Sequence, residues 1–200
     1  MNKTLVFRTK SAISAQHKAT QLVQNPLTLW VTGLSGSGKS TLAYALEEQL
    51  HLVGLKTVVL DGDNLRHGLN QDLDFTVASR SEAVRRAAEV ARLFNDAGMI
   101  VIVSLISPFA IDRALAAAVI GSGRFIEIYM DVTLEVCEAR DNKGIYQKAR
   151  RGEVKNFTGI SSPYEAPKNP TFRVDSFSGT PQLHALDIFN QIKQQFSKGV

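Results

Sequence analysis

Cysteine is nearly absent from this chain, whose 200 residues include only Cys137. A single cysteine cannot form a disulfide within the chain, which fits a protein of a reducing compartment. Cys137 has apolar neighbours and follows a segment that we expect to be a strand. We therefore interpret its thiol as a small buried group and not as a nucleophile.

Long apolar runs and long basic runs are missing as well. No stretch of 18 apolar residues occurs, so we expect no transmembrane helix and no membrane partner. The formal net charge is +4, but no long basic stretch is free of acids and interleaved with aromatic residues. The charge therefore favours small anionic ligands over nucleic acid.

Acidic residues are missing from the beginning of the chain, where Glu47 is the first. The same part carries the basic residues Lys3, Arg8, Lys10 and Lys18. This composition weakly resembles an organelle transit peptide, but residues 1–24 hold one arginine and no apolar core of a secretory signal. We favour a flexible or helical extension of a cytoplasmic protein, followed by a single α/β domain over residues 25–200.

Apolar runs alternate with amphipathic segments along that domain. Strands are expected at 27–32, 57–60, 99–105, 125–130 and 171–174. Helices are expected at 40–53, 79–96, 108–120, 133–139, 144–151 and 181–196. This alternation predicts a parallel β-sheet with helices on both faces, where ligands bind beyond the carboxyl ends of the strands. Residues 156–170 are rich in turn formers and follow a basic helix, so we expect a lid over about 143–170.

A glycine-rich stretch between the first expected strand and helix has the spacing of a phosphate-binding loop. From Gly33 to Ser40 it reads GLSGSGKS and matches G-x-x-x-x-G-K-[ST], the P-loop. Its backbone N–H groups can surround phosphates, Lys39 can reach the β- and γ-phosphates, and the Ser40 hydroxyl can ligate Mg²⁺. The expected phosphate ligands are Gly33, Ser35, Gly36, Ser37, Gly38, Lys39, Ser40 and Thr41. A GTPase is disfavoured, because the guanine-reading N-K-x-D pattern starting at Asn142 has Ile145 in place of its aspartate.

Two aspartates and a serine lie at the ends of the next expected strands. Asp61 and Asp63 flank Gly62 after the second strand, which puts both carboxylates within reach of Mg²⁺ or of an acceptor hydroxyl. An ordinary helix N-cap or Asx-turn would explain the same pair, and we favour the functional interpretation. Ser107 follows the third strand in the same way.

Arginines and aromatic residues flank the acceptor side of this expected site. Arg66 follows closely behind the two aspartates and is the better candidate for an anion ligand. Arg85 and Arg86 have the spacing of a solvated helix face, and we interpret either one alone as structural. Phe75 and Phe157 lie in polar, turn-rich surroundings. The pattern is equally compatible with two roles for these rings: packing at the edge of the core, or stacking on a base.

Several spaced motifs together resemble those of adenylylsulfate kinases. They are GLSGSGKST (33–41), LDGDNLRHGLN (60–70), SLISPF (104–109), LEVCEARDNKGIYQKAR (134–150) and GEVKNFTGISSPYEAP (152–167). The likeness runs from about residue 28 to 170. It implies a P-loop kinase fold, usually dimeric. It also implies that the γ-phosphate of ATP, with Mg²⁺, is transferred to the 3′-hydroxyl of adenosine 5′-phosphosulfate, which yields PAPS.

The resemblance also assigns roles to individual residues. It implies that Asp63 orients or deprotonates the 3′-hydroxyl, that Asp61 supports it or the metal, and that Arg140 reaches toward ATP. Phe75 and Phe157 would sandwich the adenine of adenylylsulfate. The other residues of its pocket would be Asn64, Arg66, Arg80, Ala83, Ile106 and Ser107. The mobile lid would contribute Lys143, Lys155 and Asn156.

Ser107 stands at the position that the family associates with a phosphoserine intermediate. A direct in-line transfer needs no covalent carrier, so we prefer Ser107 as a hydroxyl of the pocket wall and keep it as a catalytic candidate.

The chain departs from the family pattern at four positions. Ser79 replaces an aspartate, Ala83 an asparagine, Ala110 a basic residue and Ser161 an aspartate of the lid. The missing amide at position 83 should weaken acceptor binding by about 1 kcal/mol. Two alternatives stay open: a related kinase with another small-molecule or nucleotide acceptor, and a catalytically silent nucleotide-binding relative. The retained lysine and aspartates argue against the silent one.

Overall fold

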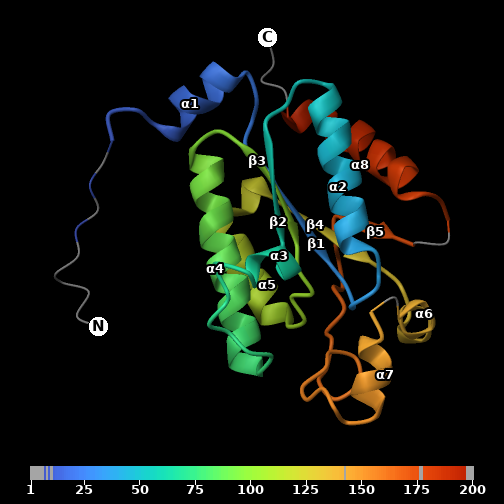
Figure 1. Ribbon diagram of the computed structural model, residues 1–200. Coiled ribbons are helices and arrows are strands. Elements are labelled where there is room, and N and C mark those ends of the chain that lie inside the picture. Colours follow the sequence, from blue (N-terminus) through green and yellow to red (C-terminus); the bar gives the residue numbers. More distant parts are fainter. Residues whose placement is uncertain (1–6, 8, 10, 142, 176–177, 197–200) are drawn as a thin grey trace.

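The computed structural model describes residues 7, 9, 11–141, 143–175 and 178–196 (Figure 1). Its strands are β1 (Thr28–Thr32), β2 (Thr57–Asp61), β3 (Ile100–Ser104), β4 (Phe125–Met130) and β5 (Phe172–Val174). Its helices are α1 (Ala15–Leu22), α2 (Lys39–Leu52), α3 (Gly62–Leu65), α4 (Val77–Asp96), α5 (Ala110–Ile120), η2 (Ser122–Arg124), α6 (Leu134–Arg140), α7 (Ile145–Arg150) and α8 (Pro181–Phe196). Asn142 and residues 1–6, 8 and 10 of the expected extension lie outside the described residues.

The strands form one parallel sheet in the order β2-β3-β1-β4-β5. Thr28 at the start of the central strand pairs with Val101 of β3 on one side and with Phe125 of β4 on the other. All five expected strands are confirmed. Because every strand runs the same way, the segments that follow β1, β2 and β3 meet at one edge of the sheet.

Helices cover both faces of the sheet, as the alternating pattern predicts (Figure 1). One core lies between the sheet and helices α2 and α8, and a second lies between the sheet and helices α4 and α5. Alternate residues of β1 serve the two sides, with Leu29 and Val31 in the first core and Trp30 in the second. A smaller cluster under the lid joins Leu34 of the P-loop to Cys137 and Tyr146. Cys137 is fully buried there, which confirms its apolar role.

Most helix boundaries agree with expectation within two residues, and two differences have clear causes. Helix α4 begins at Val77 because the Thr76 hydroxyl accepts from the N–H of Ser79 (3.3 Å) and caps it there. Helix α5 begins at Ala110 and not at 108, because Phe109 stays extended with φ −101° and ψ 132°. The short helix α3 after Asp61 was not expected. The N-terminal extension was expected to be flexible or helical, and its described part contains helix α1.

The segment 156–170 contains no helix or named strand, and its ladder is limited to one bridge between Thr158 and Ser162. This confirms its expected irregular structure. Among the described residues, no helix is both long and apolar enough to cross a membrane.

Candidate active site

The P-loop curls between the end of β1 and the start of α2. Gly36 has a φ of 75°, and a Cβ there would lie 3.3 Å from the carbonyl oxygen of Cys137. Gly33 has a φ of 153°, and a Cβ there would lie 2.8 Å from the Ser37 hydroxyl. Side chains are excluded at both positions, so the backbone stays free to surround an anion at the helix N-terminus.

Lys39 is buried at the first position of α2, and its Nζ donates to the carbonyl oxygen of Leu34 (2.7 Å). Burial lowers the pKa of this ammonium group from 10.5 to about 8, while the charges of Cys137, Asp61 and Asp63 oppose the shift. An incoming phosphate would stabilise this buried ammonium group, because it adds a negative charge beside the nitrogen that now donates to a neutral carbonyl oxygen.

Ser40 and Asp61 form the candidate Mg²⁺ site. The Ser40 hydroxyl donates to Asp61 Oδ2 (2.6 Å), and Asp61 Oδ1 accepts from the N–H groups of Asp63 (3.0 Å) and Asn64 (3.4 Å). The carboxylate therefore caps α3 with one oxygen and faces the P-loop with the other. No cluster of three His, Cys, Asp or Glu occurs among the described residues. The pair still fits Mg²⁺, because this ion is usually held by one or two protein oxygens together with phosphates and water.

Asp63 lies at the exposed mouth of the site, where it forms an ion pair with Lys143 of the lid. Both side chains are largely exposed, at 71% and 66%. The hydrogen bond from Lys143 to Asp63 raises the pKa of the lysine. The segment expected to form the lid thus places a cation on the Asp63 carboxylate, near the end of β2.

One cavity of about 160 Å³ extends from the P-loop to α4. It brings together most of the predicted residues: Ser35, Gly36, Lys39, Ser40, Asp61, Asp63, Arg66, Phe75, Arg80, Ala83, Ile106 and Ser107. Asn64 does not line it, and its Nδ2 donates to the Tyr44 hydroxyl (3.1 Å).

Two buried or half-buried arginines face this cavity around Phe75. The Arg66 guanidinium lies 4.0 Å from the centroid of the Phe75 ring and donates to the carbonyl oxygen of Leu73 (3.0 Å). Arg80 donates to the carbonyl oxygens of Phe75 (3.2 Å) and of Asn156 in the lid (2.9 Å). Burial lowers the pKa of both guanidinium groups, and the charge of Arg66 lowers that of Arg80 further. Both guanidinium groups donate to carbonyl oxygens, and the carboxylates of Asp63 and Asp74 act on Arg66 through their charge, without a hydrogen bond from it to either carboxylate among the described residues. This end of the cavity is therefore suited to an anion.

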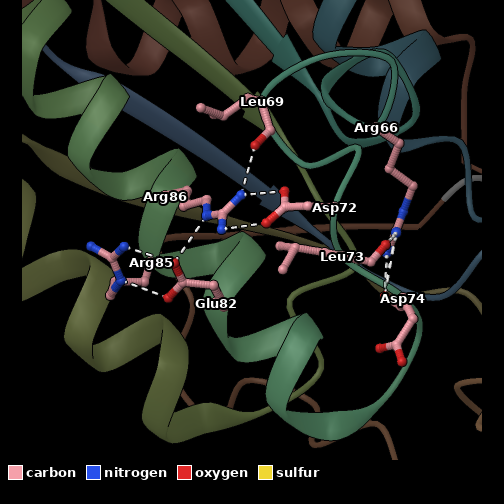
Figure 2. A network of polar contacts seen from close by, with 8 residues as sticks. All are labelled: Arg66, Leu69, Asp72, Leu73, Asp74, Glu82, Arg85 and Arg86. Carbon is pink, nitrogen blue, oxygen red and sulfur yellow. Dashed lines mark hydrogen bonds and ion pairs between the residues drawn. The ribbon is translucent and has the colours of Figure 1, made fainter.

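Arg85 and Arg86 have structural roles, as their spacing predicts (Figure 2). Arg86 forms a two-bond pair with Asp72 (2.6 and 2.8 Å), a bond to Glu82 (2.9 Å) and one to the carbonyl oxygen of Leu69 (2.8 Å). Arg85 forms a two-bond pair with Glu82 of the same helix (2.7 and 2.8 Å). The bonds of Arg86 to Asp72 and Leu69 fasten the segment between α3 and α4 to helix α4.

Ser107 is a buried wall residue whose hydroxyl is already bonded. Its Oγ accepts from Trp30 Nε1 (3.1 Å) and donates to Thr32 Oγ1 (3.0 Å). Its carbonyl oxygen accepts from Arg113 (2.7 Å), and its φ is 38°. The Trp30 and Arg113 contacts hold a left-handed backbone position in place, so the hydroxyl belongs to the frame of the cavity.

The two predicted stacking rings lie in different surroundings. Phe75 is half-exposed at the cavity, whereas Phe157 is buried in the cluster under the lid, in edge contact with Tyr146 at 4.9 Å. The N–H of Phe157 donates to the hydroxyl of Ser161, the serine that replaces the usual aspartate (3.0 Å). With the lid in this position, Phe157 packs in a small apolar cluster, which is one of the two roles that its sequence surroundings allowed. Lys155 is exposed, away from the cavity lining.

A second cavity of about 240 Å³ lies on the other side of the P-loop. It collects Ser37, Gly38, Thr41 and Arg140, which were all expected to bind ATP. It also contains His184 of α8, whose buried Nε2 has no hydrogen-bond partner among the described residues. Sequence reasoning missed His184 because a histidine on an amphipathic helix carries no distinguishing pattern. It also missed Asn70, which lines the first cavity, although this residue ends one of the quoted motifs.

Comparison with known proteins shows which family the chain resembles. A family model described as adenylylsulphate kinase matches residues 25–175. An adenylyl-sulfate kinase of Clostridium acetobutylicum is 50% identical over 96% of this chain and 95% of its own length. The bifunctional enzyme NodQ of Rhizobium tropici is 56% identical over 82% of the chain, which spans only 26% of that relative. The solved Mycobacterium tuberculosis APS kinase CysC, in complex with AMPPNP and APS, has a TM-score of 0.81 and 47% identity over 84% of this chain and 98% of its own.

Proposed function

The chain belongs to the adenylylsulphate kinase family, and from this premise we propose that it phosphorylates the 3′-hydroxyl of adenosine 5′-phosphosulfate with ATP. The product is PAPS, and the role is sulfate activation. The observation that carries the proposal is the cavity that joins the P-loop lysine, Asp63 and the Arg66–Arg80 pair. A phosphate donor, an acceptor hydroxyl and an anionic acceptor tail can meet there.

On the donor side, the P-loop holds the β- and γ-phosphates of ATP. Lys39 exchanges its bond to the Leu34 carbonyl oxygen for a phosphate oxygen, which restores a counter-charge to the buried ammonium group. Ser40 and Asp61 would hold Mg²⁺, which would neutralise charge on the phosphates. The cavity with Arg140 and His184 takes the base and ribose of ATP.

On the acceptor side, Asp63 orients the 3′-hydroxyl and accepts its proton as the phosphoryl group is transferred in line. The Lys143 ion pair occupies this carboxylate in the closed lid, so the substrate hydroxyl must displace or join it. The bonded hydroxyl of Ser107 supports a wall role and a direct transfer.

Acceptor recognition follows from charge and stacking. Arg66 and Arg80 bind the phosphosulfate, and the half-exposed Phe75 ring stacks on the adenine. Phe157 reaches the other face of the base only after it leaves its buried cluster, which requires movement of the lid. A homodimer and a cytoplasmic location stay predictions.

A coupled assay of ADP release tests the proposal. Adenosine 5′-phosphosulfate should support turnover, whereas AMP, adenosine and sugars should support little or none. Lys39→Ala is the control for contaminating kinases. Turnover with another acceptor in preference to adenylylsulfate would establish the shifted-acceptor alternative. No turnover with any acceptor, in a folded protein that binds ATP, would establish the silent one.

A further inference from the structure

Asn70 has a buried carboxamide with an unused acceptor. Asn70 is one of the residues that line the cavity of Lys39 and Arg80, only 2% of it is exposed, and its Oδ1 has no hydrogen-bond partner among the described residues. Buried polar atoms in folded proteins are nearly always bonded, because an unpaired one keeps the full cost of leaving water. An orphaned carboxamide in the wall of a ligand cavity therefore points to a bond that the ligand completes.

The position of Asn70 is fixed by its neighbours. Its N–H donates to the carbonyl oxygen of Leu65 (2.8 Å), and its carbonyl oxygen accepts from Leu73 (3.1 Å). On either side, Arg86 holds Leu69 and Arg66 holds Leu73 through their carbonyl oxygens (Figure 2). The backbone of Asn70 is thus already committed, and only its carboxamide is left to serve the cavity.

The surroundings of the carboxamide indicate an anion. Arg66 and Arg80 line the same cavity, both are partly desolvated, and their guanidinium groups donate to carbonyl oxygens of the chain. Ala83, which is 8% exposed, lines it as well and offers no polar atom. The terminal torsion of asparagine has two broad, nearly equivalent positions, so a half-turn presents Nδ2–H donors where Oδ1 now lies.

We infer that Asn70 determines specificity for the sulfuryl end of the acceptor, by donating an Nδ2–H bond to a phosphosulfate oxygen beside Arg66 and Arg80. The inference rests on the proposed function. An uncharged donor complements the two cations without adding a third charge to a desolvated site. It also supplies an amide in a cavity that has an alanine at position 83.

Steady-state kinetics of three variants test the inference. Asn70→Ala should raise the KM for adenylylsulfate about tenfold or more, because the bond to a charged oxygen is lost. The isosteric Asn70→Asp should raise it further, because its carboxylate repels the anion, and this excess should shrink at acidic pH. The KM for ATP should change less than twofold in both. The matched control is Asn95→Ala, a fully buried asparagine whose amide bonds to Thr28, Leu27 and Met99 outside the cavity. It should lower the melting temperature and leave the KM for adenylylsulfate unchanged.

Two further measurements separate recognition from structure. AMP has no sulfuryl group, so its inhibition constant against adenylylsulfate should stay within twofold of wild type in Asn70→Ala. Adding Ala83→Asn to Asn70→Ala should restore more affinity for adenylylsulfate than Ala83→Asn adds to wild type, because the second amide reaches the same oxygens.

The outcomes decide between the alternatives. An unchanged KM for adenylylsulfate in both Asn70 variants would overturn the inference, as would equal losses for adenylylsulfate, AMP and ATP. If Asn70→Ala fails to fold, the isosteric Asn70→Asp gives the decision alone. Wild-type protein that does not phosphorylate adenylylsulfate would instead refute the proposed function, and thermal-shift binding of adenylylsulfate to the same variants would still test Asn70.

Discussion

The buried ammonium group of Lys39 predicts a pH dependence. Its pKa is lowered to about 8 by burial, so the ligand-free protein loses this proton as the pH rises through 8. We expect kcat/KM for ATP to fall about tenfold per pH unit above that value, because this parameter reports the free enzyme. The kcat should fall less, since bound phosphates raise the pKa again. A pH profile at constant ionic strength measures both, and a kcat/KM that is flat to pH 9.5 would contradict the assignment.

The same group makes a prediction about stability with a definite sign. Between pH 8 and 10.5 Lys39 is deprotonated in the folded protein and protonated in the unfolded one. The unfolded state then binds more protons, so the contribution of Lys39 to the free energy of unfolding rises with pH in this window. Lys39→Met should remove that rise, and urea unfolding at several pH values, compared with wild type, measures the difference.

Asp63→Asn should separate chemistry from ATP binding. The amide cannot accept the hydroxyl proton, so we expect kcat to fall by about 10²–10⁴-fold while the KM for ATP changes little. Lys143→Met is the matched control, because it removes the ion pair on the same carboxylate and leaves the base intact. If Asp63→Asn acts mainly on the KM for ATP, the residue is a metal or nucleotide ligand.

Ser107→Ala should lower stability more than activity. It leaves the buried Trp30 Nε1 without its acceptor, at a cost of about 1–3 kcal/mol. Turnover should remain measurable, and a chirally labelled γ-phosphate should be transferred with inversion. Net retention of configuration would support a phosphoserine intermediate and refute a direct transfer.

At this scale the sequence predicts the chemistry of a residue better than its partners. The P-loop spacing is enough to expect Lys39 and Ser40 at phosphates, because only a few geometries satisfy that pattern. Nothing local shows that Phe157 is packed on Tyr146, because that contact depends on the position of the lid. The orphaned Oδ1 of Asn70 is likewise invisible without the burial that the fold imposes.

Among the elements, the expected lid bonds to two residues of the proposed acceptor site, and its C-terminal part is anchored by bonds of Tyr164 to Thr32 and of Glu165 to Ala110 and Arg113. Lys143 pairs with Asp63, and the carbonyl oxygen of Asn156 accepts from Arg80. The ion pair is largely exposed and therefore weak. Because the proposed mechanism requires both Asp63 and Arg80 to contact the acceptor, we expect these contacts to break and re-form during turnover.

Hydrogen exchange should detect this movement. The amides of 143–170 should exchange faster without ligands than with ADP and adenylylsulfate together, while β1 and β3 stay protected in both states. The sheet amides serve as the internal control. Strong and equal protection of the lid in both states would reject a moving lid.

The sequence predicts best those elements whose apolar residues follow a regular pattern over their whole length. Strands β1 and β3 are continuous apolar runs, and α4 has a long amphipathic pattern, so the structure confirms them. Helix α3 has four residues and is defined by the Asp61 cap, so it is too short to show the spacing of apolar residues that predicts a helix. The start of α5 is delayed by the Ser107–Phe109 backbone, which Arg113, in the first turn of α5 itself, supports by its bond to the carbonyl oxygen of Ser107; no apolar period indicates this bond.

For the whole molecule, the parallel sheet explains why motifs far apart in the sequence meet. The ends of β1, β2 and β3 carry the P-loop, the two aspartates and Ser107, and the order β2-β3-β1 makes them neighbours. Alternation of strands and helices predicts a parallel sheet, and hence this shared edge. It does not predict that two separate cavities flank the P-loop, because those depend on how α4, α8 and the lid pack.

The two cavities predict how ligands stabilise the molecule. A non-hydrolysable ATP analogue and adenylylsulfate should each raise the melting temperature, because each binds only the folded state. At a hundred times its Kd, one ligand adds about 2.7 kcal/mol, which is roughly 5–11 °C for a chain of this size. Differential scanning fluorimetry with each ligand alone and with ADP and adenylylsulfate together measures the shifts. The pair should give more than the sum of ADP and adenylylsulfate alone, since closure of one lid over both sites is shared between them.

Lys39→Ala supplies the control, because it should lose most of the shift with the ATP analogue and keep that with adenylylsulfate. A shift with the ATP analogue and none with adenylylsulfate at millimolar concentration would mean that the cavity of Arg66 and Arg80 serves another anion. Shifts with both ligands but no PAPS formation would mean that the protein binds both substrates and does not catalyse the transfer. The binding and turnover measurements together therefore distinguish an adenylylsulfate kinase from a kinase with another acceptor and from a silent relative.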